Sequence, residues 1–600
     1  MTRRVTTGTV PVDDDLTSGS GTARDSLTVG IWTAVSRGTG LVRVVVVAAV
    51  LGPTFFGNAY QLTNTLPNLV YYGFLAGSLL SSLLVPALVQ HIDGARPRDT
   101  ERVSGGFLGV TLMALLLVAP IVVLLVPELL RAATLGELAG GTAANQVEQT
   151  RLLLLLTIPQ VFLYAVVGSA TAVMFAHRRY AFAAAVPAME NVGIIAVLGI
   201  VAAVYGTGSD EATVPGGKML LLGLGSTMAV ALHAALQWWG AMRCGVSIRP
   251  SAGWRDAEVR RIIRRAMNAV AQAGLLTVQL LTLLLVASRV PGGVVALQIS
   301  VNFYNLPIAL AAAPVALALL PRLSRLAQSQ RDGEFTDTYL RALRLALFVI
   351  LPAACGYVVL ARAIAHTVAA GEMATARGTA MISASLAALA FGLVGATIFL
   401  LATQVAYARG DTRTPLISMS VQTCVCLALC GLSTIARGDH LLTLVAASYA
   451  LAALFGGMHL LLRLRRHAVP TEQRLWPTFL RSGVGVAVTL PAVHVCVQLL
   501  TANSSGRTGW TFALAVGGVV GVAVYWVTQS LLQAPELSWV VAGLPRGPSV
   551  RDRVPRNRPG RAKRFARART RRQVLRMTVT SVIVASVAMA AGALVARHLF

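Results

Sequence analysis

Residues 27–51 read LTVGIWTAVSRGTGLVRVVVVAAVL, and runs of this kind decide the fold. Arg37 and Arg43 are the two charged residues in this run. A helix needs about 20 mainly apolar residues to cross the hydrocarbon core of a bilayer. Comparable runs recur along the whole 600-residue chain. The sequence therefore predicts a helical membrane protein that crosses the bilayer many times.

The composition supports this prediction. Hydrophobic residues make up 55% of the chain and charged residues 12%, whereas about 25% of the residues in a typical soluble domain are charged. A single soluble core cannot bury so much apolar surface. The composition thus excludes a soluble enzyme, a disulfide scaffold and a disordered chain.

Fifteen apolar runs are long enough to be spans. Their bounds are 27–51, 60–90, 105–130, 151–176, 181–205, 217–242, 262–288, 293–320, 341–368, 379–406, 414–436, 440–463, 478–501, 509–533 and 575–598. We expect an all-α integral membrane protein with about fourteen transmembrane helices and an extra C-terminal helix. The expected segments are a disordered cytoplasmic tail (1–25), two transporter halves (26–250 and 251–470), helices 13 and 14 (471–535), a basic cytoplasmic linker (536–574) and the extra helix (575–600).

The loop charges predict the orientation. Lys and Arg total 51 against 24 Asp and Glu, a formal net charge of +27. With the N-terminus in the cytoplasm, the inner loops between the first fourteen spans hold 23 basic residues and the outer loops hold 8. This asymmetry matches the positive-inside rule. Residues 546–576 carry thirteen more basic residues and are expected to be cytoplasmic. We expect a multi-pass protein of the cytoplasmic membrane that contacts anionic lipids. No nucleic-acid-binding motif accompanies the charge, so nucleic acid is not an expected partner.

A weak internal repeat divides the chain. The second and eighth spans each contain a Leu-Pro pair, at Leu66-Pro67 and at Leu306-Pro307. The fifth and eleventh spans are both entered through a proline, Pro187 and Pro415. Duplicated halves with broken helices are typical of secondary transporters, which bind substrate between the halves. We therefore expect two pseudo-repeated halves around a central hydrated cavity.

Motifs for catalysis are absent from the sequence. It contains no phosphate-binding loop of the ATPase type, no His-Glu-x-x-His and no Gly-x-Ser-x-Gly, so we expect no enzyme activity. The cluster of Cys424, Cys426 and Cys430 has no neighbouring His or carboxylate in the sequence. Neither a metal site nor a bound cofactor is expected.

Charges inside the spans are the most informative residues, because each is costly unless it is paired or hydrated. Arg37 and Arg43 lie in the first span and Glu190 in the fifth. We expect Arg37 to face the cavity and bind an anionic group, since guanidinium suits phosphate. Arg43 is expected either to contact the same headgroup or to brace Glu190. Two interpretations of Glu190 carry equal weight: a structural partner for an arginine, or a proton or cation site.

Uncharged polar residues form a second group of candidates. Asn58, Asn64 and Asn68 lie in or near the second span, and Asn302 lies in the eighth. They are expected to bind substrate in the cavity, and some of them to hydrogen-bond between helices instead.

Short motifs in order along residues 27–533 carry a family resemblance. They are Ser36-Arg37-x-x-Gly40-x-x-Arg43, Leu66-Pro67-Asn68-Leu69, Asn191-Val192-Gly193, Leu319-Leu320-Pro321-Arg322 and Tyr407-Ala408-Arg409-Gly410-Asp411-Thr412-Arg413-Thr414-Pro415. Together they resemble the MurJ (MviN) family of lipid II flippases, within the multidrug/oligosaccharidyl-lipid/polysaccharide exporter superfamily. The resemblance implies fourteen helices and alternating access that moves a polyprenyl-diphosphate-linked peptidoglycan precursor, lipid II or a similar lipid, to the outer leaflet.

The chain departs from the family pattern at several positions. Charged residues of relatives are replaced here at Asn58, Tyr71, Tyr72, Thr282 and Asn302. Arg37, Arg43 and Asp411 are retained, and Glu190 has no family counterpart. Glu190 and Asp411 are the candidates for coupling transport to Na⁺ or H⁺. Two alternatives stay open: a divergent paralogue that exports another amphipathic, lipid-linked or lipidated product, and a non-transporting scaffold that recruits cell-wall synthesis proteins.

Overall fold

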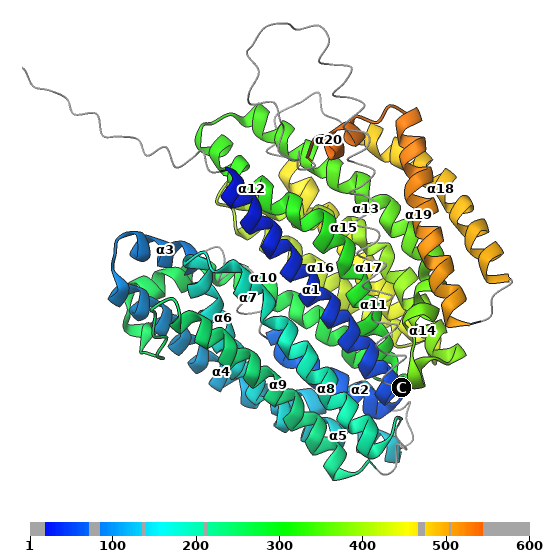
Figure 1. Cartoon of the computed structure of the whole chain (residues 1–600), viewed down its shortest axis with the longest axis horizontal. Helices are drawn as coiled ribbons and strands as arrows, with labels where there is room; N and C mark the ends of the chain where they lie inside the picture. The colour runs from blue at the N-terminus through cyan, green and yellow to red at the C-terminus, as the bar shows by residue number, and fades with distance from the viewer. Residues whose placement is uncertain are drawn as a thin grey trace, which may run out of the picture.

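The computed structural model describes residues 19–70, 84–134, 140–208, 214–465, 475–502 and 506–543. Within these ranges the ordered elements are all helical. Figure 1 shows two groups of helices, one built from the N-terminal half and one from the C-terminal half, with α1 running between them. The predicted all-α class is confirmed.

The N-terminal half contains nine α-helices among its described residues. They are α1 (Gly19–Leu51), α2 (Phe55–Val70), α3 (Val85–Asp93), α4 (Pro97–Thr134), α5 (Gly140–Thr157), α6 (Pro159–Ala176), α7 (Tyr180–Ala185), α8 (Pro187–Tyr205) and α9 (Gly216–Met242).

The rest of the described chain begins with a short turn and continues through long helices. The elements are η4 (Gly253–Arg255), α10 (Ala257–Ala287), α11 (Gly293–Pro307), η5 (Ile308–Ala312), α12 (Ala313–Gln328), α13 (Asp332–Val368), η6 (Gly371–Met373), α14 (Ala376–Ala390), α15 (Gly392–Ala408), α16 (Arg413–Ser433), α17 (Asp439–Arg465), α18 (Trp476–Ala502), α19 (Arg507–Leu531) and α20 (Pro535–Gly543).

The observed spans match the predicted ones closely. Among the described residues, twelve helices are long and apolar enough to cross a membrane, and thirteen if α14 and α15, bent by 45°, count as one span. Each of these thirteen coincides with a predicted span. The second predicted span, 60–90, corresponds to α2 and α3, and residues 71–83 between them lie outside the described residues. The predicted extra helix at 575–600 also lies outside the described residues, as does most of the basic linker.

Two observed helices extend across expected segment boundaries. Helix α1 begins at Gly19, inside the predicted disordered tail, and no proline interrupts residues 19–51. Helix α20 occupies the start of the predicted linker. It begins at Pro535, a favourable first helical residue, and its Glu536 forms a buried ion pair with Arg344 of α13.

Prolines break the helices where the sequence predicts. Helix α8 begins at Pro187, which places Glu190 in its first turn. Pro307 closes α11 and is followed by the π-helical segment η5. Pro67 lies inside α2. A proline removes one backbone hydrogen bond and crowds the preceding turn, which accounts for the helix boundaries at Pro187 and Pro307.

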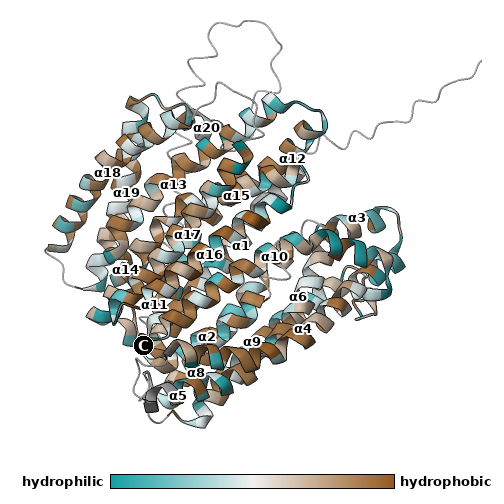
Figure 2. Cartoon of the chain, turned by 180° about the vertical axis from the view of Figure 1, so that it is seen from behind, coloured by the Kyte–Doolittle hydropathy of each residue, from teal (hydrophilic) through white to brown (hydrophobic). Residues whose placement is uncertain are grey.

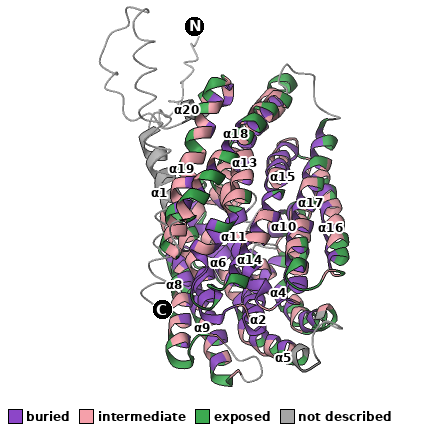
Figure 3. Cartoon of the chain, turned by 90° about the vertical axis from the view of Figure 1, so that its right-hand side faces the viewer, coloured by how far each residue is buried: buried purple, intermediate pink, exposed green. Residues whose placement is uncertain are grey.

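The apolar surface is suited to lipid. Large hydrophobic side chains of α4, including Leu116, Leu117 and Leu124, are exposed, and apolar residues cover the outer helices in Figure 2. Buried residues gather instead where the two halves meet, around α2, α11 and α14 (Figure 3). The chain is thus a multi-pass membrane protein whose apolar residues serve both its core and its bilayer-facing surface.

The molecule has two distinct ends. Consecutive spans run in opposite directions, so α3, α6, α12 and α15, which close the second, fourth, eighth and tenth spans, end on the same side of the membrane. We call this end, after Arg96, Arg178, Arg325 and Arg409 at or just beyond these helix ends, the arginine-rich end, and the other the opposite end. The ribbons of α3 and α12 diverge toward the arginine-rich end (Figure 1).

Helix α10 belongs to both halves. Near its start, Arg102 of α4 pairs with Asp256 and Glu258. Farther along, Gln279 donates to Thr423 of α16 at 2.8 Å. The predicted boundary at residue 250 therefore precedes a helix that connects the halves.

Candidate functional site

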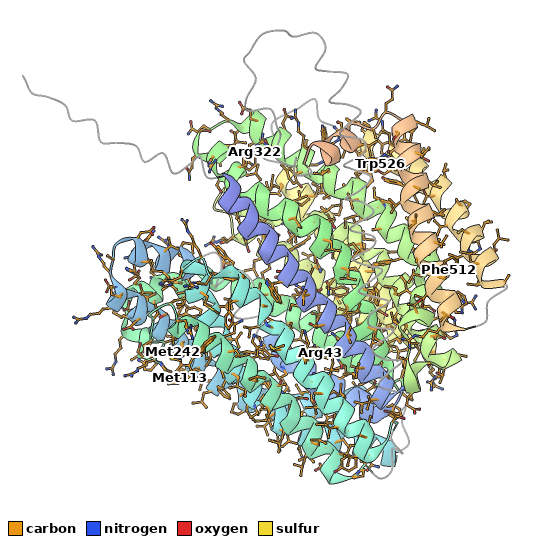
Figure 4. All side chains as sticks on the ribbon, in the orientation of Figure 1. Arg43, Met113, Met242, Arg322, Phe512 and Trp526 are labelled. Atoms are coloured by element: carbon orange, nitrogen blue, oxygen red, sulfur yellow. The ribbon has the colours of Figure 1, made fainter. Side chains whose placement is uncertain are left out.

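The two arginines of α1 have different surroundings. Arg43 is half-buried and lies near the middle of the molecule (Figure 4). The Arg43 Nη1 atom is 3.5 Å from Glu190 Oε1. Arg37 is exposed and has no hydrogen-bond or ion-pair partner among the described residues. Six residues turn a helix by roughly 240° net, so the two side chains leave α1 in different directions. Of the two roles open for Arg43, the structure favours contact with Glu190.

Glu190 is the centre of a buried cluster. Its Oε1 accepts a hydrogen bond from the Tyr164 hydroxyl at 2.8 Å, and its Oε2 lies 2.7 Å from His233 Nδ1. We call Arg43, Tyr164, Glu190 and His233 the buried tetrad. The four residues come from α1, α6, α8 and α9 respectively.

Small and polar residues bring these helices close enough for the tetrad to form. A Cβ added to Gly193 of α8 would lie 2.8 Å from the Ala229 Cβ of α9. Asn191 donates to Ser36 O at 3.2 Å and to Thr39 Oγ1 at 3.1 Å, which ties α8 to α1. The family-like Asn-Val-Gly motif therefore packs the helices around Glu190.

The far side of the imidazole faces an amide. His233 Nε2 is 3.5 Å from Gln237 Nε2, and the same Gln237 nitrogen donates to Ala183 O at 3.1 Å. Gln237 Oε1 is buried without a hydrogen-bond partner. In the neutral tautomer that fits these contacts, Nδ1 donates to Glu190 and Nε2 accepts. Arg43 and Glu190 then cancel each other's charge.

Sequence reasoning missed Tyr164, His233 and Gln237. Full charges stand out within an apolar span, whereas a single histidine such as His233 does not. A signal was present, because histidine is ionisable near neutral pH and ionisable residues within a membrane are functional candidates. The i, i+4 spacing of His233 and Gln237 also places both on one face of α9.

The structure places Asn58 at a joint between the halves. It is fully buried, its Nδ2 donates to Val290 O at 2.8 Å, and its Oδ1 accepts from Val294 N at 3.0 Å. Its amide satisfies backbone groups of the turn between α10 and α11. In this conformation Asn58 holds the opposite end together and does not line a cavity.

The remaining predicted substrate residues are not brought to one point. Asn64 is buried on α2 and Asn68 is half-buried there. Asn302 of α11 is half-buried and donates to Gln298 O of its own helix at 2.8 Å. Their contact with substrate stays a prediction.

Asp411 lies apart from the tetrad. Its Oδ1 accepts from the backbone N–H groups of Arg413 and Thr414, each at 3.0 Å, and so caps the start of α16. Asn268 of α10 donates to Thr412 in the same turn at 2.8 Å. The two ion-coupling candidates thus lie in different halves, and the observed contacts of Asp411 are those of a helix cap.

Comparison with known proteins identifies the family. Residues 47–529 match the family model described as "Lipid II flippase MurJ". The "Probable lipid II flippase MurJ" of Vibrio cholerae serotype O1 is 27% identical over 445 residues, covering 73% of this chain and 83% of that protein. The protein of the same name from Rhizobium meliloti is 26% identical over 534 residues, covering 87% of this chain and 96% of that protein.

Solved structures agree on the fold. A structure titled "Lipid II flippase MurJ, inward closed conformation" covers 84% of this chain and 98% of its own, with a TM-score of 0.64 and 18% identity. An inward-facing multidrug resistance MATE family transporter of the MOP superfamily covers 72% of this chain and 94% of its own, with a TM-score of 0.57 and 12% identity. The family match extends over most of the transmembrane region, and the chain belongs to the lipid II flippase MurJ family.

Proposed function

We propose that the chain moves a polyprenyl-diphosphate-linked peptidoglycan precursor, lipid II or a close relative, from the cytoplasmic to the outer leaflet. The names of its relatives support this substrate class. The observation that carries the proposal is the position of Arg37. It is exposed on α1, the helix that packs against both α8 of the N-terminal half and α11 of the C-terminal half.

Arginine suits this substrate for a physical reason. A guanidinium keeps its charge at any physiological pH and offers aligned donors that match two phosphate oxygens. Arg37 has no partner among the described residues that would compete with an arriving phosphate. Arg43 is held by Glu190 at 3.5 Å, longer than an ideal ion pair, and can be released. The lipid chains would stay in the bilayer.

Alternating access fits the arrangement of the halves. At the opposite end the halves are joined by Asn58, by Gln146 donating to Ser288 O at 3.3 Å, and by Thr207 donating to Glu372 at 2.8 Å. At the arginine-rich end the ribbons of the two halves diverge (Figure 1). We assign the arginine-rich end and the N-terminus to the cytoplasm by the positive-inside rule. Under this assignment the halves are joined on the outer side, and outward opening would break the bonds at the opposite end.

Energy for net movement would come from the membrane. A charge moved across the bilayer gains about 2.3 kcal/mol per 100 mV. The proposed cycle needs no chemical change in the substrate and no bound cofactor. Anionic lipids would contact the arginine-rich loops.

A complementation experiment tests the proposal. Cells depleted of their own lipid II flippase receive the wild-type chain, Arg37→Ala, Arg37→Lys or the control Arg362→Ala, which changes another exposed arginine, all at matched membrane levels. We expect rescue by the wild type and the control, no rescue by Arg37→Ala, and partial rescue by Arg37→Lys.

Two other results would overturn the proposal. No rescue by the wild type would indicate an exporter of a different amphipathic product. Equal rescue by the wild type and Arg37→Ala would indicate a scaffold that supports cell-wall synthesis proteins without transport.

A further inference from the structure

The buried tetrad contains a titratable pair that simple anion binding leaves unused. His233 and Glu190 are both buried, and 2.7 Å separates Nδ1 from Oε2. We propose that Glu190 and His233 form a proton-binding site, and that it takes up a proton when the diphosphate of the substrate reaches α1. The proposal rests on the proposed function for the identity of the anion and adds the coupling ion.

Proton uptake by the pair and binding of the diphosphate favour each other because of the charges in the tetrad. With neutral His233, the tetrad has one positive and one negative group, Arg43 and Glu190. One added proton gives it a net positive charge. Such a charge is costly in a low-dielectric interior unless an anion is near. By linkage, an anion that favours the protonated state must bind more tightly as the pH falls.

The structure has a place for the added proton. A protonated imidazole donates from both nitrogens, and Nδ1 already faces Glu190. Nε2 faces the Gln237 amide, whose Oε1 is buried and lacks a partner. Buried oxygens without a hydrogen bond are uncommon and call for an explanation. A half-turn of this amide would present Oε1 to Nε2–H, so Gln237 can serve either protonation state.

We assign the proton to Glu190 and His233 because the other polar side chains around them have contacts of their own. Arg43 of α1 carries the permanent charge that faces it, and Tyr164 of α6 donates to the carboxylate. From α2, the Tyr60 hydroxyl is bonded to Ser226 at 2.9 Å. Tyr180 of α7 packs on the Phe175 ring with centroids 5.6 Å apart.

The other charged groups on neighbouring helices point elsewhere. Glu148 and Arg151 of α5 are exposed. Lys218, at the start of α9, donates to Gly208 O at 2.6 Å.

Arg43 links protonation of the Glu190–His233 pair to anion binding at α1. Its 3.5 Å contact with Glu190 is long for a charge-assisted bond. A shared proton reduces the negative charge that holds the guanidinium, so more of the positive charge of Arg43 acts on an anion near α1. Protonation of the pair therefore strengthens the attraction of α1 for a diphosphate, although Arg37 and Arg43 leave the helix in different directions.

The test measures lipid II binding to the purified full-length chain in lipid nanodiscs across about pH 5 to 8, the range in which histidine titrates. The wild type should bind more tightly on acidification, by up to about tenfold per pH unit for one linked proton. His233→Gln should lose this dependence.

The matched control is His459→Gln. His459 lies in an apolar helix of the other half, with Nδ1 3.0 Å from Ser418 Oγ, and the control should keep the wild-type profile. Equal pH dependence in the wild type and His233→Gln, or loss of it in both histidine variants, would overturn the inference. Failure of the wild type to bind lipid II at any pH would instead refute the proposed function.

A second variant covers the case in which His233→Gln does not fold. Gln237→Leu keeps Glu190 and His233 but removes the acceptor for the second imidazole proton. Its profile should move to lower pH, since the protonated state has lost a hydrogen bond. An unchanged profile in this variant would also contradict the proposal.

Discussion

Two buried glutamates in this chain are each paired with an arginine, but in different ways. Glu536 of α20 accepts from Arg344 Nε at 2.9 Å and Nη2 at 2.7 Å, and from the Thr478 hydroxyl at 2.6 Å, all at Oε1. Glu190 has one arginine contact, at 3.5 Å, and its shortest contact is to a histidine. The ring of Trp539 also covers Arg344, 5.1 Å from the guanidinium carbon.

The difference separates a structural ion pair from a switchable one. The partners of Glu536 keep their charge or hydrogen-bonding capacity at any physiological pH, so this pair fixes α13, α18 and α20 together. The partners of Glu190 include the imidazole of His233, which together with Glu190 forms the proposed proton-binding site. We infer that the first pair supports the fold and the second supports transport.

The largest expected effect is a loss of stability when the Arg344–Glu536 pair is broken. Glu536→Ala leaves Arg344 buried without its carboxylate, and removing one member of a buried pair costs about 3–5 kcal/mol. We expect a clear fall in the thermal unfolding midpoint of the purified chain, while lipid II flipping per folded molecule stays near the wild-type value. Loss of flipping in correctly folded Glu536→Ala would break the comparison.

Acidification should act on Glu536 in a defined direction. Burial alone raises the pKa of Glu536, but the Thr478 hydrogen bond and the Arg344 guanidinium outweigh it and hold the pKa below its ordinary 4.5. A lowered pKa means that the stabilisation is complete above pH 4.5 and is lost as the pH falls through the folded-state value. The unfolding midpoint of the wild type should therefore drop more steeply below that pH than the midpoint of Glu536→Gln. Parallel curves for the two proteins would contradict this assignment.

The smallest effect compares two hydroxyl groups. Thr478→Val and Tyr164→Phe each remove one hydrogen bond to a buried carboxylate, at a cost of about 1 kcal/mol. The Thr478 hydroxyl also accepts from Arg344 Nε at 2.8 Å, so the unfolding midpoint should fall further in Thr478→Val than in Tyr164→Phe. Only Tyr164→Phe should shift the pH profile of lipid II binding, because only the carboxylate bonded to Tyr164 belongs to the proposed proton-binding site. An equal shift in Thr478→Val would remove the distinction between the two glutamates.

Much of the fold could be predicted from the sequence, because membrane spans depend on local composition. Thirteen predicted spans coincide with observed ones, and the break before α8 follows from Pro187. The pairing of Glu190 with an arginine was one of two predicted outcomes, since a charge inside a membrane is costly unless it is paired or hydrated.

The rest depended on contacts between distant segments. His233 and Tyr164 meet Glu190 from two other helices, and no local pattern specifies that meeting. Asn58 was expected in a cavity but hydrogen-bonds to the turn between α10 and α11, more than 200 residues away. Helix α20 was missed because the residue that pairs with its Glu536, the buried Arg344, lies far away in the chain.

The most direct test of the central claim is the rate at which labelled lipid II crosses the bilayer of proteoliposomes containing the purified chain. We expect the wild type to accelerate this movement, Arg37→Ala to abolish the acceleration, and Arg362→Ala to match the wild type at equal protein content. No acceleration by the wild type, or full acceleration by Arg37→Ala, would contradict a flippase that binds the diphosphate of its substrate through Arg37 of α1.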